Sequence, residues 1–106
     1  MKPISQEQEY LYRITQGDKP AIEQLYNEHF PVIRGMVCNR GGVEEDAKDV
    51  FQDAVLVLYL KAKEPGFRLT SSVGTYFFSI CKNIWYNTIA RKGFSNEISF
   101  DDDYSA

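Results

Sequence analysis

The sequence is poor in the residues from which metal and redox sites are built. It contains one histidine, His29, and two cysteines, Cys38 and Cys81, which lie far apart and belong to no CxxC or Cys/His motif. A structural zinc site needs four such ligands at close spacing, so the sequence argues against one. We expect both thiols to be reduced and buried in the core, as free cysteines usually are. No metal or other cofactor is predicted.

Long apolar runs are also absent. The N-terminal residues are mostly polar, unlike the apolar centre of a signal peptide, and no stretch approaches the ~20 apolar residues that span a bilayer. We therefore expect a cytoplasmic protein without membrane insertion. The chain has 106 residues, 43% hydrophobic and 25% charged, which suits one soluble domain with one core.

The small net charge of -3 hides three blocks of different sign. Residues 1–60 carry six Lys/Arg against ten Asp/Glu, residues 61–92 carry six against Glu64 alone, and residues 93–106 carry four acidic residues and no basic one. The blocks therefore have net charges of -4, +5 and -4. A basic segment between two acidic ones predicts a polyanionic partner for the middle and other partners for the flanks.

Apolar residues at three- and four-residue spacing predict an all-α fold, a compact bundle of about four helices. Ser5 and Gln8 resemble a capping box that begins a short first helix, which Gly17 ends. Asp18 is the expected N-cap of a second helix that runs to about Val37. Pro31 lies inside this helix and is expected to kink it or to split it in two.

The third helix is predicted from Glu44 to about Lys63, where Pro65 and Gly66 follow. Its apolar stretch from Ala54 to Leu60 predicts a central position, and a buried strand is the competing interpretation. The absence of turn residues before Lys63 favours the helix. A fourth helix should begin after the Thr70–Ser72 cluster and end at Gly93, so the predicted domain covers residues 1–93. Residues 94–106 form an acidic, flexible tail in this interpretation.

The fourth helix has two contrasting faces. Its expected core stripe consists of Val73, Phe77, Ile80, Ile84 and Thr88. The opposite face presents Thr75, Tyr76, Ser79, Lys82, Asn83, Tyr86 and Asn87, flanked by Phe78 and Trp85. Stacking on aromatic rings is worth about 1–3 kcal/mol per unpaired base, and lysine meets phosphate, so this mixture suits single-stranded nucleic acid. The alternative is that these aromatic rings extend the core.

The third helix presents an acidic and amide face. Asp49, Gln52 and Asp53 stand at positions i, i+3 and i+4 and therefore share one side of the helix. Such a face beside an apolar seam can dock a basic helix, whereas the alternative is an ordinary solvated surface. A catalytic or metal-binding carboxylate pair is a third interpretation. It has little support, because a di-metal bundle needs Glu-x-x-His repeats and His29 is the only histidine.

Three segments resemble one known family in order and spacing. They are DAKDVFQDAVLVLY at residues 46–59, VGTYFFSICKNI at residues 73–84 and GDKPAIEQLYNEHFPVI at residues 17–33. Each is similar to a segment of region 2 in bacterial RNA polymerase sigma factors of the extracytoplasmic-function group. The resemblance covers roughly residues 8–92, and it implies a helical domain of that type.

The resemblance assigns roles to individual positions. Asp49, Gln52 and Asp53 match the element with which these factors grip the clamp helices of the polymerase β′ subunit, and Leu56 follows one turn later. The fourth helix matches the one that recognises and melts the −10 promoter element, and the loop before it matches a pocket for a base flipped out of the non-template strand. The implied DNA-binding residues are Phe67, Arg68, Tyr76, Ser79, Lys82, Asn83, Tyr86, Arg91 and Lys92.

The sequence also departs from the family. A run of arginines usual near the end of the fourth helix is reduced to Arg91 and Lys92, so DNA binding by the isolated domain should be weak. The 14 residues after Lys92 are too few for the helix-turn-helix domain with which this family reads the −35 element. Residues 94–103 resemble the beginning of the acidic interdomain linker, so we expect the chain to be part of a longer factor.

The expected function is therefore that of a sigma factor domain, not of an enzyme. It would bind core RNA polymerase and capture the non-template strand of the −10 element, and an anti-sigma factor is a further candidate partner. One alternative is an interaction module of the same fold that acts on polymerase or an anti-sigma partner without binding DNA. A second alternative is an enzyme with an acidic site.

Overall fold

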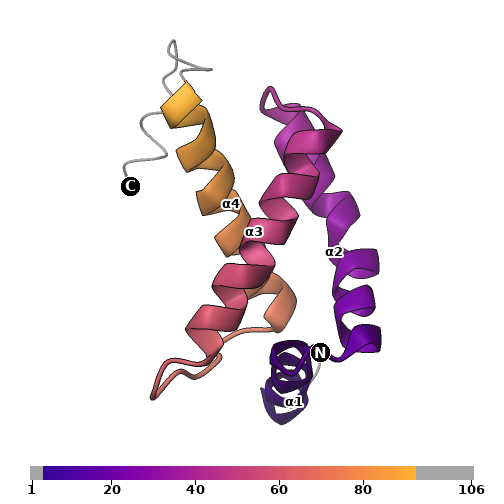
Figure 1. The fold of residues 1–106 in the computed structure, drawn as a ribbon, viewed down its shortest axis with the longest axis vertical. Coiled ribbons are helices and arrows are strands. Elements are labelled where there is room, and N and C mark those ends of the chain that lie inside the picture. Colours follow the sequence, from indigo (N-terminus) through magenta and orange to yellow (C-terminus); the bar gives the residue numbers. More distant parts are fainter. Residues whose placement is uncertain (1–3, 93–106) are drawn as a thin grey trace.

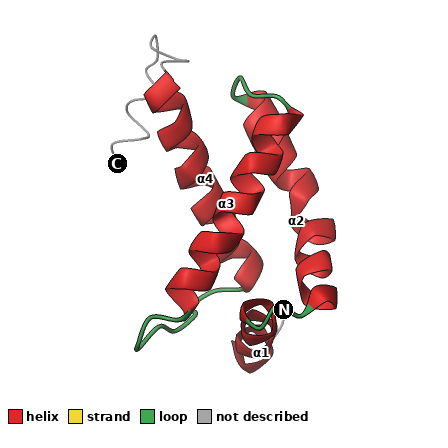
Figure 2. Cartoon of the chain, in the orientation of Figure 1, coloured by secondary structure: helices red, strands yellow, loops and turns green. Residues whose placement is uncertain are grey.

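The computed structural model of the chain describes residues 4–92, which form four α-helices and no strand (Figure 1). They are α1 (Ile4–Thr15), α2 (Lys19–Asn39), α3 (Glu44–Ala62) and α4 (Val73–Lys92), joined by the short loops shown in Figure 2. The predicted all-helical fold is confirmed for this part of the chain. The acidic tail predicted at residues 94–106, and Gly93 as a helix end, lie outside the described residues.

Helix α3 holds the domain together. It crosses the middle of the view in Figure 1 and packs against each of the other three helices, as its apolar stretch predicted. The stretch is not buried on all sides, however. Ala54 and Leu58 are fully buried, whereas Leu56 and Leu60 are 57% and 54% exposed. One side of α3 therefore remains uncovered by the described residues.

Several helix ends follow from the local sequence. The carboxylate of Asp18 accepts a hydrogen bond from the backbone N–H of Ala21 at 3.3 Å, so it caps α2 as predicted. The hydroxyl of Ser72 accepts from the N–H of Thr75 at 3.1 Å and caps α4. Gly17 has a φ of 76°, a left-handed conformation that ends α1 at little steric cost.

The predicted capping box at the beginning of α1 is wrong. Ser5 already lies within α1, and the side-chain oxygen of Gln8 accepts a hydrogen bond from the N–H of Leu69 at 3.1 Å. Glu7, only 5% exposed, accepts from the N–H of Val73 at 2.7 Å. The Glu7 carboxylate thus caps α4, because the first N–H groups of a helix have no partner within it, whereas Gln8 binds the loop that precedes α4.

The predicted split of the second helix at Pro31 is also wrong. α2 runs without a break from Lys19 to Asn39, with Pro31 exposed inside it. Proline has no backbone N–H, so one hydrogen bond of the helix is lost at this position. Packing of the other side of the helix against its neighbours offsets that loss. The kink at Pro31 stays a prediction.

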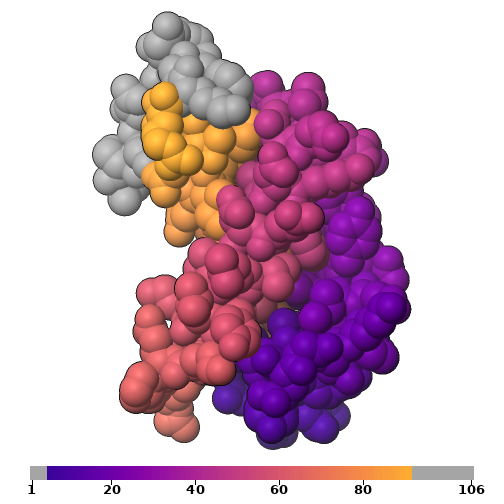
Figure 3. Space-filling view, viewed as in Figure 1, coloured from indigo at the N-terminus to yellow at the C-terminus, as the bar shows by residue number. Residues whose placement is uncertain are grey.

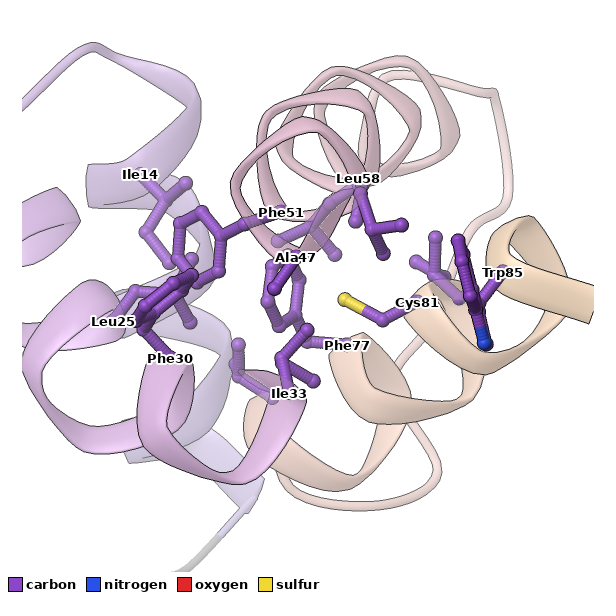
Figure 4. Packing of buried hydrophobic residues seen from close by; sticks show 14 of the residues in the cluster. Ile14, Leu25, Phe30, Ile33, Ala47, Phe51, Leu58, Phe77, Cys81 and Trp85 are labelled. Atoms are coloured by element: carbon purple, nitrogen blue, oxygen red, sulfur yellow. The ribbon is translucent and has the colours of Figure 1, made fainter. Parts of the chain in front are cut away.

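The core is built around aromatic contacts between three helices (Figure 4). The ring of Phe51 meets that of Phe77 edge to face at 5.0 Å between centroids, and that of Phe30 at 6.0 Å. Cys81 is buried beside them, and burial raises the pKa of its thiol to about 12. The prediction of a buried thiol is wrong for Cys38, which is exposed at the end of α2; both cysteines are free.

Candidate docking face and candidate nucleic-acid face

The residues predicted to bind polymerase form one exposed stripe on α3. Asp49, Gln52, Asp53 and Leu56 are all exposed, and their spacing places them on one side of the helix. Leu60 continues the stripe, and Lys63 lies just beyond its end. We call these six residues the α3 outer face. In Figure 3, α3 runs across the visible surface of the molecule.

The α3 outer face points outward because the opposite side of α3 supplies core residues. These are Ala47, Val50, Phe51, Ala54 and Leu58. Among the described residues, no hydrogen bond or ion pair engages the side chains of Asp49, Gln52 or Asp53. By contrast, Asp46 accepts a hydrogen bond from the N–H of Val43 at 2.9 Å and so caps its own helix. Asp49 and Asp53 are thus exposed acidic residues on the same side of α3 as Gln52, and their carboxylates have no partner among the described residues.

An open groove of about 790 Å³ borders the α3 outer face. It lies between α2 and α3, and its lining residues are Ile22, Glu23, Tyr26, Asn27, Lys48, Phe51, Gln52 and Val55. Its aromatic side is packed, because the Tyr26 ring stacks on Phe30 at 4.8 Å and meets Phe51 edge to face at 5.2 Å. Gln52 belongs to both surfaces. The sequence did not indicate this groove, since its lining combines residues 22–27 of α2 with residues 48–55 of α3 and depends on how the two helices pack.

The second predicted site combines the loop before α4 with the first turns of that helix. The half-buried rings of Phe67 and Tyr76 lie 5.7 Å apart, so the loop packs directly on α4. Ser79 and Asn83 follow Tyr76 at helical spacing and are exposed, as is Lys82. The hydroxyl of Ser79 donates to the carbonyl oxygen of Tyr76 at 2.7 Å. The structure therefore brings the loop and helix residues together.

Tyr86 does not lie on this exposed face, contrary to prediction. It is 7% exposed, and the Arg40 guanidinium and the Lys82 ammonium lie 5.4 and 5.7 Å from its ring centroid. A ring covered in this way offers no open surface for a base. Trp85, placed on the flank by sequence, is 1% exposed and packs in the core.

The buried side of α4 is wider than its predicted stripe. Val73, Phe77 and Ile80 are buried as predicted, whereas Ile84 and Thr88 are only partly buried. The remaining buried residues of α4 are Cys81, Trp85, Tyr86 and Ile89. The difference arises because α4 packs against α2 and α3 together, so two neighbours bury a broader arc than one.

Cations are sparse around the α4 face. Arg68, Lys82 and Arg91 are exposed, and the side chain of Lys92 lies outside the described residues. Two more lysines of the basic segment have partners nearby. The ammonium of Lys63 donates to the Tyr59 hydroxyl at 3.1 Å, and that of Lys61 lies 3.8 Å from Glu64. The described part of the basic segment thus presents few cations to a polyanion.

Within residues 4–92, no three His, Cys, Asp or Glu side chains gather closely enough to hold a metal ion. None of the four helices has the length and hydropathy required to cross a membrane.

Comparison of the chain with models of known protein families, with curated proteins and with solved structures finds no match. A functional assignment therefore depends on the residues and their arrangement.

Proposed function

We propose that this chain is a sigma factor region 2-like domain that binds core RNA polymerase and captures the non-template strand of the −10 promoter element. One observation carries the proposal. The three residues that match the polymerase-gripping element, Asp49, Gln52 and Asp53, form a single exposed face with Leu56, and they have no other partner among the described residues. A match placed on buried residues would have removed this support.

In the proposed mechanism, the α3 outer face docks on the clamp helices of the polymerase β′ subunit. The basic side chains of such a partner would meet Asp49 and Asp53, Gln52 would hydrogen-bond, and Leu56 would be removed from water. Because α4 packs directly against α3, docking of one helix fixes the orientation of the other. The domain itself carries out no chemistry in this proposal.

The α4 face and the preceding loop would then hold the unpaired strand. Extruding a base costs a few kcal/mol, and stacking on an aromatic ring returns about 1–3 kcal/mol per base. Tyr76 is the proposed platform, with Phe67 supporting its ring and Arg68 near a phosphate. Ser79 and Asn83 would contact base edges, and Lys82, Arg91 and Lys92 would contact phosphates. Tyr86 has no role in stacking here, because its ring is covered.

A binding measurement with core RNA polymerase tests the docking step. The variant Asp49→Ala with Gln52→Ala should bind at least about tenfold more weakly than wild type, since two buried polar contacts are lost. Gln6→Ala with Glu9→Ala is a matched control, because it removes an exposed amide and an exposed acid from α1. Equal polymerase binding by wild type and by the α3 variant would contradict the docking assignment.

The sparse cations and the covered Tyr86 favour one second candidate, an interaction module that binds polymerase without DNA. Fluorescence anisotropy with a single-stranded −10 oligonucleotide, with and without core polymerase, separates the two. Strand capture predicts weak binding by the domain alone and strong binding, lost in Tyr76→Ala, when polymerase is present. The interaction module predicts that Tyr76→Ala changes neither signal.

A further inference from the structure

The α3 outer face carries opposite charges at its two ends. Asp49 and Asp53 lie toward the beginning of α3, Lys63 follows its last residue, and Leu56 and Leu60 lie between them. The two leucines are 57% and 54% exposed, four residues apart on the same side. Two large apolar side chains so placed, with charges on both sides, have the layout of a small interface centre with a polar rim.

The α3 outer face is complementary to the same face of a second copy of the chain whose α3 runs in the opposite direction. Consider a two-fold axis that passes midway between Leu56 and Leu60, at the level of residue 58. Asp53 and Lys63 lie five residues on either side of that level, each about 7.5 Å away along the helix axis. The axis therefore places Leu56 opposite the partner's Leu60, and Asp53 opposite the partner's Lys63. A parallel copy would instead set like charges against each other.

We propose that the α3 outer face binds a second copy of this chain, with the two α3 helices antiparallel. The symmetry makes every contact occur twice, so the interface contains two leucine pairs and two pairs of Asp53 with the partner's Lys63. The Lys63 ammonium donates an exposed hydrogen bond to Tyr59 and lies 4.8 Å from the centroid of that ring, and exposed side-chain contacts of this kind are easily exchanged. Asp53 has no competing contact among residues 4–92.

The dimer should be weak and dependent on concentration. A single pair of crossing helices of this length covers less surface than a stable interface of about 1,200–2,000 Å². It would nevertheless cover Asp53 and Leu56, which belong to the proposed polymerase-docking set. Self-association and polymerase binding would then exclude each other. The dimer itself does not depend on the proposed function, since its evidence is the charge pattern of α3.

Sedimentation equilibrium over a concentration series tests the proposal. The average mass of wild type should rise from that of one chain toward that of two between about 10 µM and 1 mM, the range of weak interfaces. Asp53→Lys and Lys63→Asp should each weaken association by about tenfold or more, because both place like charges together twice. The combined variant, Asp53→Lys with Lys63→Asp, should associate about as strongly as wild type.

Two controls make the result specific to this face. Glu9→Lys and Lys19→Asp produce the same changes of net charge at exposed positions on α1 and α2, and they should leave association unchanged. Leu56→Asp should leave a monomer, with circular dichroism used to check that its helices are retained. A monomeric mass for wild type at every concentration would overturn the proposal, as would a charge-swapped variant that stays monomeric.

The same variants separate this inference from the proposed function. The variant with both Asp53→Lys and Lys63→Asp should self-associate like wild type, because each copy in the dimer carries both changed charges. Its binding to core polymerase should stay weak, because the charges of polymerase are unchanged. If wild type dimerises but does not bind polymerase, the proposed function fails and the dimer stands. If wild type binds polymerase but is monomeric, the outcome is reversed.

Discussion

Gly42 lies so close to Trp85 that no side chain fits between them. A Cβ atom on Gly42 would lie 2.7 Å from Cη2 of the Trp85 indole and 2.6 Å from Cγ1 of Val37. Both neighbouring side chains are buried, with exposures of 1% and 0%, so neither can turn into solvent to make room. The loop between α2 and α3 thus closes over α4 at Trp85, the residue that the sequence had placed on the flank of the exposed face.

Gly42→Ala should therefore destabilise the domain. Overpacking of a closely packed site typically costs about 1–3 kcal/mol, and urea denaturation should show this loss in the free energy of unfolding. Gly35→Ala is the matched control, because a Cβ at Gly35, on the exposed side of α2, meets nothing within 4 Å. There alanine should stabilise the helix by about 0.5–1 kcal/mol. Equal stability of the two variants would contradict this packing.

The burial of Trp85 shows what a helical pattern leaves undetermined. Spacing along α4 identified Val73, Phe77 and Ile80 as core, because these positions follow one helix face. The spacing does not determine how many residues beside that face are also buried. Their number depends on how many neighbouring elements pack against the helix and on where a glycine allows a loop to come close. The caps at Asp18 and Ser72 were predictable for the opposite reason, since their partners lie three residues away.

The hydrogen bond from Val73 N–H to Glu7 was hidden from sequence reasoning because it joins residues 66 positions apart. Glu7→Ala should lower the free energy of unfolding by about 1–3 kcal/mol, since it leaves a buried N–H without an acceptor and removes a negative charge from a helix N-terminus. Glu7→Gln retains an acceptor and should cost less. Glu9→Ala, at an exposed position of α1, should change stability by under about 0.5 kcal/mol. Urea denaturation of the three variants provides the measurement.

Two buried groups, the Cys81 thiol and the Tyr10 hydroxyl, should make the folded state less stable at alkaline pH. Burial raises the pKa of the Cys81 thiol from 9.0 to about 12, and burial with the nearby charges of Glu28 and Glu7 raises the pKa of the Tyr10 hydroxyl from 10.0 to about 12. In the unfolded chain both groups release their protons at lower pH than in the folded protein. The unfolded state therefore binds fewer protons in this range, and stability falls as pH rises.

Below about pH 9 these two groups should cause almost no change in the free energy of unfolding. Above that pH, the free energy of unfolding should fall by roughly 1.4 kcal/mol per pH unit for each group that is ionised in the unfolded chain and protonated in the folded one. Cys81 supplies most of this slope between its unfolded pKa of 9.0 and the Tyr10 value of 10.0, because Tyr10 of the unfolded chain is still mostly protonated there. Cys81→Ala should remove most of the slope in that interval, while Cys38→Ala, at an exposed position, should keep it. Urea denaturation between pH 7 and 11 measures both. An unchanged slope in Cys81→Ala would contradict this assignment.

The proposed strand contacts should separate into charge and stacking when salt is varied. For single-stranded DNA, each phosphate contact contributes about 0.7 to the slope of log affinity against log salt. Lys82→Ala and Arg91→Ala should each reduce that slope by about this amount, because both cations are exposed on α4. Tyr76→Ala should instead lower affinity at every salt concentration and leave the slope unchanged, since stacking carries no charge. Lys19→Ala, exposed on α2, is the control, and anisotropy titrations at four salt concentrations give the slopes. A slope reduced equally by Lys19→Ala would show that binding follows net charge and not the α4 face.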